Sequence, residues 1–515
     1  MIRAAQLDRT LLWSACSGLL LACAFPGPDL AVVAWFALIP LLLVMERRPF
    51  AGGFIAGFAF FAPLLYWLNI VMTTYGQLHP FFSLVAHLLL VAYLSLFFAA
   101  ATWLSCRLKA LLALPIIVTL PVVWVALEYL RGWLFTGFPW GLLGYSQQNL
   151  PWMIQGADLS GVYGVSLLLL LINCAAAGLL AAPRRRFSRR AAIVVSLLLA
   201  GHLGYGYWRL AGAPERRNEQ LRVALIQGNI DQAVKWDPEQ RSRTVETYRR
   251  LSEQAAASGV DLIIWPEAAA PFYLQDDSPL SRQVQAVSHQ LGSYLLVGGP
   301  AYERKPSDDA FSYYNSAYLY SPAGRSLGRS DKIHLVPFGE YVPLGKLLTF
   351  INKLVVGVGD FSAGRVAPLA LDGHALGVLI CYEAIFPELA RDYVRQGSDL
   401  LVNITNDAWF GRSPASRQLL AMTRFRAVEN RVWIARAANT GISALVTPGG
   451  GVTLATPLFE TLQVVGQVGL GAQPTFYNRY GDLLPRFCLI VASCWLLAAR
   501  QLRRRQGRTG TPPLP

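Results

Sequence analysis

Long apolar runs dominate the first 210 residues of this 515-residue chain. A membrane-spanning helix needs about 20 predominantly apolar residues, and eight segments are candidates for such helices. They are centred on 11–24, 29–45, 53–73, 83–105, 111–130, 161–181, 191–210 and 484–500. Residues from about 214 to 480 have the polarity of an ordinary globular sequence. The chain is therefore expected to combine a polytopic α-helical membrane domain of eight spans with one water-facing domain.

These runs suggest three parts. Residues 1–212 would hold spans 1–7, residues 213–480 an extracytoplasmic domain, and residues 481–515 the eighth span and a basic tail. The first apolar run could also be read as a cleaved signal peptide. The seven apolar segments that follow favour an uncleaved first span.

Basic residues mark every second loop of this arrangement. They precede the first span and follow the second, fourth, sixth and eighth, whereas loops 25–29 and 74–82 carry no Lys or Arg. Since short basic loops remain in the cytoplasm, both termini are expected to be cytoplasmic and residues 211–483 to lie outside. The basic residues that give the net charge of +14 then lie at the membrane edges. No nucleic-acid partner is therefore expected.

The water-facing segment alternates two kinds of run. Strand-like stretches alternate with helix-like ones, a pattern typical of an α/β domain with mostly buried strands. The expected strands are 221–227, 260–265, 294–298, 313–320, 375–381, 399–404 and part of 433–447, and the expected helices are 238–257, 278–291, 386–395 and 415–433.

One cysteine stands apart from the other six. Cys381 is the only cysteine in the polar half of the chain, at the end of the apolar run 377–380. Taken alone, it would be read as a small core residue. It could also be a nucleophile.

Two further residues favour the nucleophile. Glu267 ends the run Ile264-Trp265-Pro266-Glu267, and Lys332 precedes a second carboxylate, Glu340. A thiol, a base and a positive charge for an oxyanion are the parts of a thioester-forming acyl-transfer site. Glu383 would share a strand face with Cys381 if the strand continues. Each residue alone has a structural explanation, but the combination is hard to attribute to chance.

The sequence around these residues resembles the nitrilase superfamily. The matching motifs are Trp265-Pro266-Glu267, Lys332 upstream of Pro337-Phe338-Gly339-Glu340, and Cys381-Tyr382-Glu383. The resemblance implies a Glu-Lys-Cys triad on an αββα sandwich. A closer resemblance, to the bacterial apolipoprotein N-acyltransferase family, rests on the decapeptide 334–343, the words 235–238 and 403–411, and the apolar segments.

This second resemblance implies a function. Cys381 would take an acyl chain from a phospholipid, typically phosphatidylethanolamine, and pass it to the N-terminal amine of an S-diacylglyceryl-cysteine apolipoprotein. Glu267 would act as base and then acid, Lys332 would stabilise the oxyanion, and Glu340 would orient Lys332 or shuttle a proton. The expected enzyme is a monomer of the bacterial inner membrane, with a periplasmic catalytic domain and no metal or organic cofactor.

Further site residues follow from the same resemblance. Trp236, Tyr382 and Glu383 match positions needed for activity and are expected to shape the acyl and amine pockets. Weaker correspondences give Asn315, Glu429 and Trp140, and Trp140 could also anchor the chain at the membrane interface.

The segment 344–359 is apolar for a water-facing loop. We expect it to form a lid that admits acyl chains, with Phe350 and Leu354 on its apolar face. A buried core helix is the alternative.

Two other functions remain open from the sequence. A membrane-tethered nitrilase-type amidase would use the same triad, although seven preceding spans exceed what an anchor needs. A polytopic transporter would place charges along a pathway, and Glu128, Arg131 and Asp158 are the few candidates.

Overall fold

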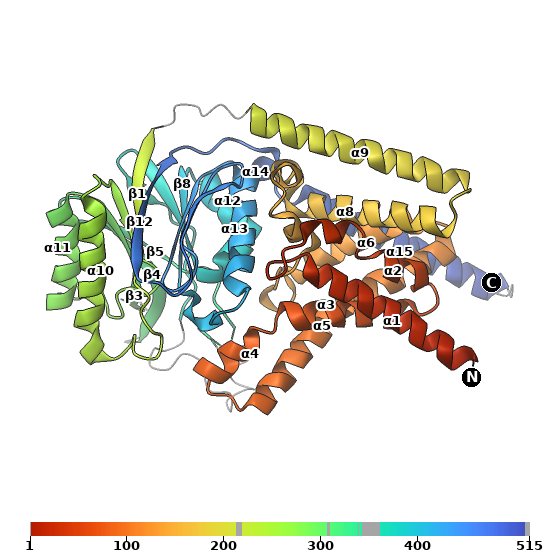
Figure 1. The fold of residues 1–515 in the computed structure, drawn as a ribbon, viewed down its shortest axis with the longest axis horizontal. Helices are drawn as coiled ribbons and strands as arrows, with labels where there is room; N and C mark the ends of the chain where they lie inside the picture. The colour runs from red at the N-terminus through yellow and green to blue at the C-terminus, as the bar shows by residue number, and fades with distance from the viewer. Residues whose placement is uncertain (1, 213–218, 306–309, 338, 342–360, 510–515) are drawn as a thin grey trace. The chain divides into compact units, whose positions relative to one another are not determined.

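The computed structural model describes residues 2–212, 219–305, 310–337, 339–341 and 361–509. Its contacts divide the chain into two units (Figure 1). The helical unit comprises Met1–Tyr66, Leu84–Gly212 and Tyr480–Pro515, and the α/β unit comprises Trp67–Ser83 and Ala213–Arg479. The expected lid residues Phe350 and Leu354 lie outside the described residues.

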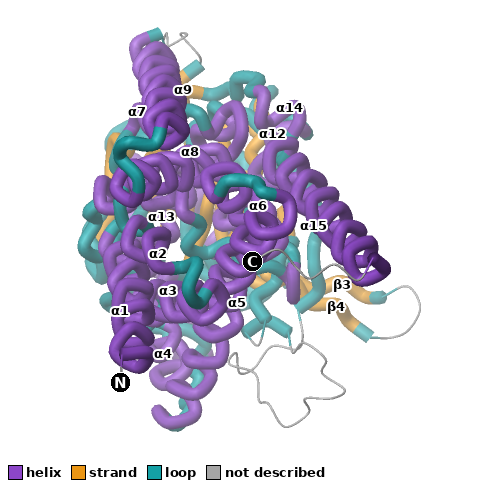
Figure 2. Tube along the Cα trace, turned by 90° about the vertical axis from the view of Figure 1, so that its right-hand side faces the viewer, coloured by secondary structure: helices purple, strands orange, loops and turns teal. Residues whose placement is uncertain are grey.

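The helical unit is built from helices packed in pairs. Helix α1 packs on α3, α6 on α8 and α15, and α8 on α9 (Figure 2). The bounds are α1 Ile2–Cys23, α2 Ile39–Val44, α3 Pro49–Leu64, α5 Pro80–Leu112, α6 Ile116–Arg131, α7 Pro151–Ile154, α8 Ala157–Ala181, α9 Arg186–Ala211 and α15 Leu483–Thr509.

Within the described residues, four helices are long and apolar enough to cross a membrane: Pro80–Leu112, Ala157–Ala181, Arg186–Ala211 and Leu483–Arg504. A fifth span would be the pair Pro49–Leu64 and Leu68–Tyr75, which is bent by 57°. The expected third span, 53–73, is therefore broken, close to Pro63, which lacks an N–H for the helix ladder. The full set of eight spans stays a prediction.

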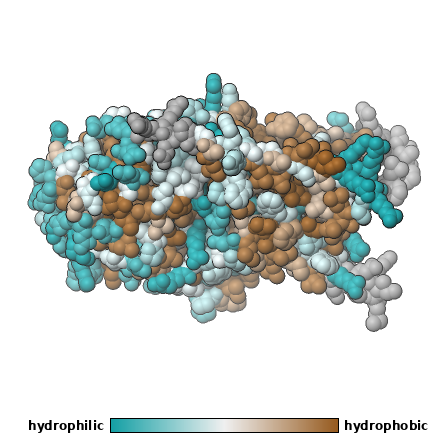
Figure 3. Space-filling model, turned by 45° about the horizontal axis from the view of Figure 1, so that its top comes forward, coloured by the Kyte–Doolittle hydropathy of each residue, from teal (hydrophilic) through white to brown (hydrophobic). Residues whose placement is uncertain are grey.

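The surface of the helical unit is suited to lipid. Large apolar side chains of α9 are exposed, among them Ile193, Leu197 and Tyr207. Figure 3 shows hydrophobic residues gathered over the helical unit and hydrophilic residues over the outer helices of the α/β unit. Exposed apolar area of this kind marks a surface that contacts a membrane or another apolar partner.

The α/β unit contains two six-stranded sheets. Their strand orders are β12-β1-β2-β3-β4-β5 and β11-β10-β9-β8-β7-β6. Strands β1, β2 and β3 run parallel, as do β7, β8 and β9, and the remaining pairs are antiparallel. The bounds are β1 Gln220–Gln227, β2 Leu262–Ile264, β3 Tyr294–Arg304, β4 Phe311–Tyr320, β5 Ser326–Asp331, β6 Leu369–Leu371, β7 His374–Ile380, β8 Leu400–Thr405, β9 Ile434–Ala438, β10 Ala444–Val446, β11 Val452–Ala455 and β12 Leu462–Gly469.

Helices cover the outer face of each sheet (Figure 1). Helices α10 (Arg241–Ala256) and α11 (Pro279–Leu291) lie on the first sheet, and α12 (Pro387–Arg395) and α13 (Ala415–Asn430) on the second. The sheets face each other, with β1 against β9 and β4 against β7. This layering is the αββα sandwich expected from the sequence.

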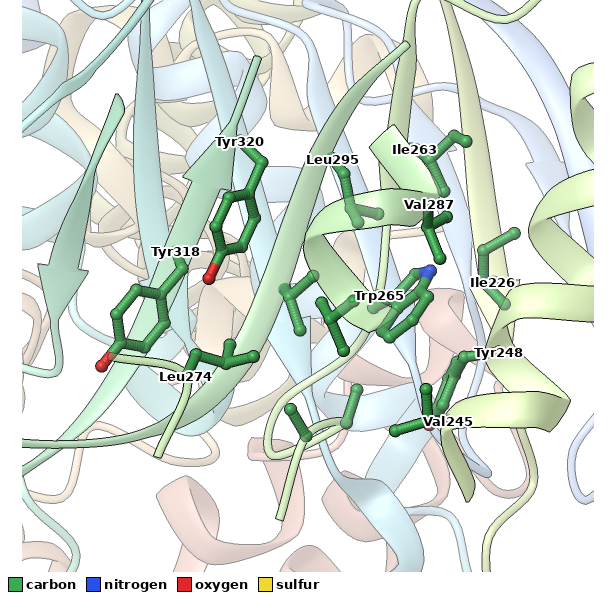
Figure 4. Close-up of a cluster of buried hydrophobic side chains, with 14 of the residues drawn as sticks. Ile226, Val245, Tyr248, Ile263, Trp265, Leu274, Val287, Leu295, Tyr318 and Tyr320 are labelled. Atoms are coloured by element: carbon green, nitrogen blue, oxygen red, sulfur yellow. The ribbon is translucent and has the colours of Figure 1, made fainter. Parts of the chain in front are cut away.

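A buried cluster between the first sheet and its helices fixes the end of β2 (Figure 4). The Trp265 ring stacks on Tyr248, with ring centroids 5.0 Å apart, and its Nε1 donates to Ser252 Oγ at 2.9 Å. Both partners belong to α10, so the residues directly before Glu267 are fixed by packing and by a hydrogen bond.

A short segment from the N-terminal half of the chain belongs to the α/β unit. It contains α4 (Leu68–Ile70) and the π-helix η2 (Val71–Tyr75). Tyr75 Oη donates to the carbonyl of Ala408 at 2.8 Å, and its ring lies edge-on to Trp409. Trp67 meets Phe410 in the same way, with centroids 4.9 Å apart. The segment therefore packs on the turn that follows β8.

Candidate active site

The thiol of Cys381 lies at the end of a buried strand. Strand β7 ends at Ile380, and Cys381 opens the 3-10 turn η6 (Cys381–Ile385) with a φ of 57°. This left-handed conformation is uncommon for a residue with a Cβ and is characteristic of functional turns. The strand does not continue, so the expectation that Cys381 and Glu383 share a strand face is wrong.

Two carboxylates, an amide and an ammonium meet in a buried cluster. Lys332 Nζ lies 2.9 Å from Glu340 Oε1 and 3.5 Å from Glu267 Oε1. Asn315 Nδ2 donates to the same two oxygens, at 3.0 Å and 2.8 Å respectively. Because these residues follow β2 and β5 or lie on β4, one sheet brings together residues that are up to 73 positions apart (340 − 267).

The thiol joins this cluster through Glu267. The Glu267 carboxylate acts electrostatically on the Cys381 thiol, and the backbone N–H of Asn406 donates to Glu267 Oε2 at 2.9 Å. The structure thus brings Glu267, Lys332 and Cys381 together, as the sequence predicted. It also includes Glu340 and Asn315.

Electrostatics sets the resting protonation states. Burial raises the pKa of Cys381, and the Glu267 carboxylate raises it further. Burial also opposes ionisation of Glu267, but Lys332 and the hydrogen bonds outweigh it and hold the pKa of Glu267 below its usual value. The pKa of Lys332 is raised because its two carboxylates outweigh the cost of burial. A protonated thiol therefore rests beside an ionised base and an ammonium group.

Glu383 connects the two loops that carry Lys332 and Cys381. Its Oε1 accepts from the backbone N–H groups of Ile333 and His334, at 2.6 and 2.9 Å, and its Oε2 accepts from Ile380 at 2.6 Å. Burial raises the pKa of Glu383 to about 7. Its contacts are with backbone amides, so it positions the site rather than lining the pocket that we expected it to shape.

Two other expected residues lie beside the cluster. The Tyr382 ring is nearly buried against His334 and Phe386, with centroids 5.7 and 5.2 Å away. Trp236 is half-buried and directly follows Lys235, which reaches the site. Both positions are compatible with the expected role in shaping a pocket.

Two of the weaker candidates lie elsewhere. Glu429 is fully buried on α13, where it pairs with Arg426, and Arg426 in turn donates to the carbonyl of Ile385 at 3.2 Å. Through Arg426, Glu429 therefore supports the turn after Cys381. Trp140 belongs to the helical unit, where it is 2% exposed and stacked on Phe138. An interfacial anchor would leave its ring accessible.

Several polar residues of the site were not among the expected site residues. The ammonium of Lys235 is fully buried and donates to the backbone carbonyl of Glu267 at 3.0 Å. Asn403 Nδ2 donates to the carbonyl of Cys381 at 3.1 Å. Arg436 pairs with Asp407 at 2.8 Å and also donates to Asn403. The density of polar residues in 403–407, at the end of the buried strand β8, and the matching segment 235–238 are signals that could have identified part of this network.

No group of three or more His, Cys, Asp or Glu side chains that could hold a metal ion occurs among the described residues. The chemistry available to the cluster is that of a thiol, carboxylates and ammonium groups. Such a set is suited to nucleophilic acyl transfer with general acid–base assistance.

Known proteins share both parts of this chain. The apolipoprotein N-acyltransferase N-terminal domain matches residues 17–175, and the carbon-nitrogen hydrolase domain matches residues 222–471. An apolipoprotein N-acyltransferase of Geobacter metallireducens is 46% identical over 511 residues, covering 96% of each chain. The chain belongs to the apolipoprotein N-acyltransferase family. A second relative of that name, from Methylococcus capsulatus, is 35% identical and covers 98% of this chain and 99% of its own.

The family places the chain among acyltransferases of the carbon-nitrogen hydrolase superfamily. The two-sheet unit is the nitrilase-like fold of that superfamily. Nit3 of Saccharomyces cerevisiae, a nitrilase-superfamily structure, is 19% identical with a TM-score of 0.37, covering 49% of this chain and 90% of its own. Together with the apolar helices, membership of the family identifies a membrane enzyme that N-acylates lipoproteins.

Proposed function

We propose that the chain carries a fatty acyl group from a membrane phospholipid to the N-terminal amine of a diacylglyceryl apolipoprotein, through a thioester on Cys381. One observation carries the proposal. The Glu267 carboxylate is near enough to the Cys381 thiol to act on its ionisation, and the same carboxylate lies 3.5 Å from the ammonium of Lys332. A nucleophile, its base and a cation are therefore in one buried cluster.

In the first half-reaction the thiol attacks the ester carbonyl of the phospholipid. Glu267 accepts the thiol proton, the sulfur–carbon bond forms, and the charge develops on the carbonyl oxygen close to Lys332. Collapse of the tetrahedral intermediate breaks the carbon–oxygen ester bond. Glu267 returns the proton to the departing alcohol, which leaves as a lysophospholipid.

In the second half-reaction the amine of the apolipoprotein attacks the thioester. Glu267 accepts a proton from the amine, the carbon–nitrogen bond forms, and the sulfur leaves and regains the proton. Since the lysophospholipid departs before the acceptor enters, one cleft serves both substrates and the kinetics are ping-pong.

Glu340 and Asn315 have supporting roles in this scheme. Glu340 holds the ammonium of Lys332 at 2.9 Å, and Asn315 bridges Glu267 and Glu340. Both contacts restrict the side chains that must meet the reacting carbonyl. Fixed geometry of this kind lowers the entropic cost of reaching the transition state.

The membrane setting extends the proposal. The chain would have eight spans, cytoplasmic termini and a periplasmic catalytic domain, with domain limits at 1–212, 213–480 and 481–515. The alternation of basic loops and the exposed apolar side chains of α9 support this arrangement. Phosphatidylethanolamine is the proposed donor in the inner membrane, and the enzyme would act as a monomer.

Intact mass spectrometry tests the covalent step. The detergent-purified protein is incubated with phosphatidylethanolamine beside Cys381→Ser and a control, Cys494→Ser, which changes an exposed cysteine of α15. We expect a fatty-acyl increment on the wild type and the control but not on Cys381→Ser. A diacylglyceryl lipopeptide should discharge the increment, and water should not. The absence of any increment on folded protein would contradict the thioester.

The same experiment separates the competing functions. An amidase would lose the fatty-acyl increment to water as fast as to lipopeptide. A transporter would be recognised by a separate variant, Cys381→Ala, which would keep full function. The candidate charges of a transport pathway have structural partners. Asp158 pairs with Arg209 at 2.9 Å, and Glu128 accepts from the backbone N–H of Leu143 at 2.8 Å.

A further inference from the structure

A second buried ammonium lies at the active site. Lys235 precedes the 3-10 turn η5 (Pro238–Gln240), and its side chain is fully buried. Its Nζ donates to the backbone carbonyl of Glu267 at 3.0 Å. In the proposed acyl transfer Lys332 alone supplies the cation, and Lys235 has no role.

The contacts of Lys235 do not account for a buried charge. Among the described residues, its ammonium makes one hydrogen bond, to a neutral carbonyl, and no salt bridge. An ammonium has three donors, and burying it without a carboxylate partner is costly. A methionine or leucine would fill such a position at lower cost if the side chain only filled space.

The charges that act on Lys235 belong to the reaction. Burial lowers the pKa of Lys235 to about 8. Two groups oppose this effect and favour the charged ammonium: Glu267, from the turn after β2, and Cys381, from the turn after β7. Lys235 is therefore charged at pH 7 and becomes neutral as the pH rises through about 8.

The charge count of the cluster indicates what this ammonium does. Glu267 and Glu340 carry two negative charges, and Lys332 supplies one positive charge that both carboxylates share. Without Lys235 the cluster has an excess negative charge before the reaction begins. Negative charge on the sulfur or on a substrate oxygen would then form against like charge, which is unfavourable in a buried site.

We propose that Lys235 is a positioning residue of the acyl transfer, which holds the backbone of Glu267 and whose positive charge stabilises the thiolate of Cys381 and the anionic intermediate. This inference rests on the proposed function for its second half. The hydrogen bond fixes the base, and the charge neutralises the cluster. The two contributions can be separated by substitution.

The test measures the rate at which iodoacetamide alkylates Cys381 in the full-length protein, read from the mass of the Cys381 peptide. Lys235→Gln keeps a donor for the Glu267 carbonyl but removes the charge, and Lys235→Arg keeps the charge. At pH 7 we expect Lys235→Gln to react at least about tenfold more slowly than wild type. Lys235→Arg should remain close to the wild-type rate.

The pH dependence supplies a readout that a purely structural role would not change. The ratio of the wild-type rate to the Lys235→Gln rate should fall towards one as the pH rises through about 8, because wild-type Lys235 then loses its charge. The wild-type profile alone should bend near that pH, and the bend should be absent from Lys235→Arg. Thermal unfolding checks that the variants are folded.

Two outcomes would overturn the proposal. Equal rates for Lys235→Gln and wild type at pH 7 would leave Lys235 a hydrogen-bond donor only. A wild-type profile with no bend near pH 8 would exclude a role for its charge, even if both variants failed to fold. Alkylation needs no lipid, so this result is independent of whether Cys381 forms the thioester.

Discussion

The carboxylate of Glu383 lies 2.6 Å from the backbone nitrogen of Ile333 and accepts its N–H. Ile333 directly follows Lys332, and Glu383 lies two residues after Cys381. The side chain therefore connects the loop of the cation to the turn of the nucleophile, and the geometry between ammonium and thiol depends on it.

Glu383→Ala should disconnect these loops. Three backbone N–H groups would lose their acceptor, and the buried one, that of Ile380, would do so at a cost of about 1–3 kcal/mol. We expect a large drop in the thermal unfolding temperature and loss of acyl transfer, measured with a fluorescent lipopeptide acceptor. Glu246→Ala, at an exposed position on α10, should change neither. Normal stability and activity of Glu383→Ala would contradict the proposed connection.

Lys332→Met should leave two buried carboxylates without their shared cation. Breaking a buried ion pair from one side costs about 3–5 kcal/mol, so the unfolding free energy should fall by this order and acyl transfer should cease. Adding Glu340→Gln removes one of the uncompensated charges. The double variant should regain stability but not activity. Recovery of activity in the double variant would show that Lys332 is not required for the chemistry.

Asn315→Ala should move the acid limb of the pH–activity profile to higher pH. Asn315 stabilises the ionised form of Glu267, so its removal raises the pKa of that carboxyl, and a protonated carboxyl cannot take the thiol proton. A lost hydrogen bond to a charged group corresponds to about one pH unit. The measurement is kcat/KM of acyl transfer between pH 4 and 7.

The control for this shift is Asn478→Ala. Asn478 donates to Asn430 at 2.8 Å and has no contact with the triad among the described residues. Its acid limb should coincide with that of the wild type. An unchanged limb in Asn315→Ala would mean that another group sets the acid side of the profile.

Gly441→Ala should disturb the network of Arg436, Asp407 and Asn403 that holds the backbone carbonyl of Cys381. The added Cβ would lie 2.1 Å from Asp407 Oδ2, the oxygen that holds Arg436. Moving Asp407 would uncouple a buried ion pair, at a cost of about 3–5 kcal/mol. Gly201→Ala, on α9 with nothing within 4 Å of the added atom, should be neutral or stabilising by up to about 1 kcal/mol. Equal melting temperatures for the two variants would contradict the strain at Gly441.

Glu267 and Cys381 could be found from the sequence because each follows an expected strand, and Lys332 because it precedes the motif Pro337-Phe338-Gly339-Glu340. Glu267, Lys332 and Cys381 lie directly or almost directly after β2, β5 and β7. The pattern of buried strands thus placed Glu267 and Cys381 at strand ends, but it did not place Lys332. The edge strands β5, β6, β11 and β12 were not predicted, because they are short or half-exposed and lack a clear apolar period.

The remaining site residues could not be predicted because their role depends on distant pairing. Asn406 meets Glu267 across 139 positions of sequence. Lys235 stood in the sequence only as the first residue of the segment 235–238, and the packing of the turn against Glu267 buries it. The third membrane span was predicted incompletely for another reason. Hydropathy alone does not show that the run 53–73 is bent by 57°.

The segment Trp67–Ser83 has a practical consequence for protein production. The α/β unit is discontinuous in sequence, because it includes Trp67–Ser83. Residues Trp67, Ile70 and Tyr75 of this segment cover the turn 408–411. This turn directly follows Asn406, which donates to Glu267, and Asp407, which pairs with Arg436. A recombinant fragment restricted to residues 219–479 would expose Trp409 and Phe410 to water. Such a fragment should aggregate or lose its active-site turn, and a graft of residues 67–83 should restore its solubility.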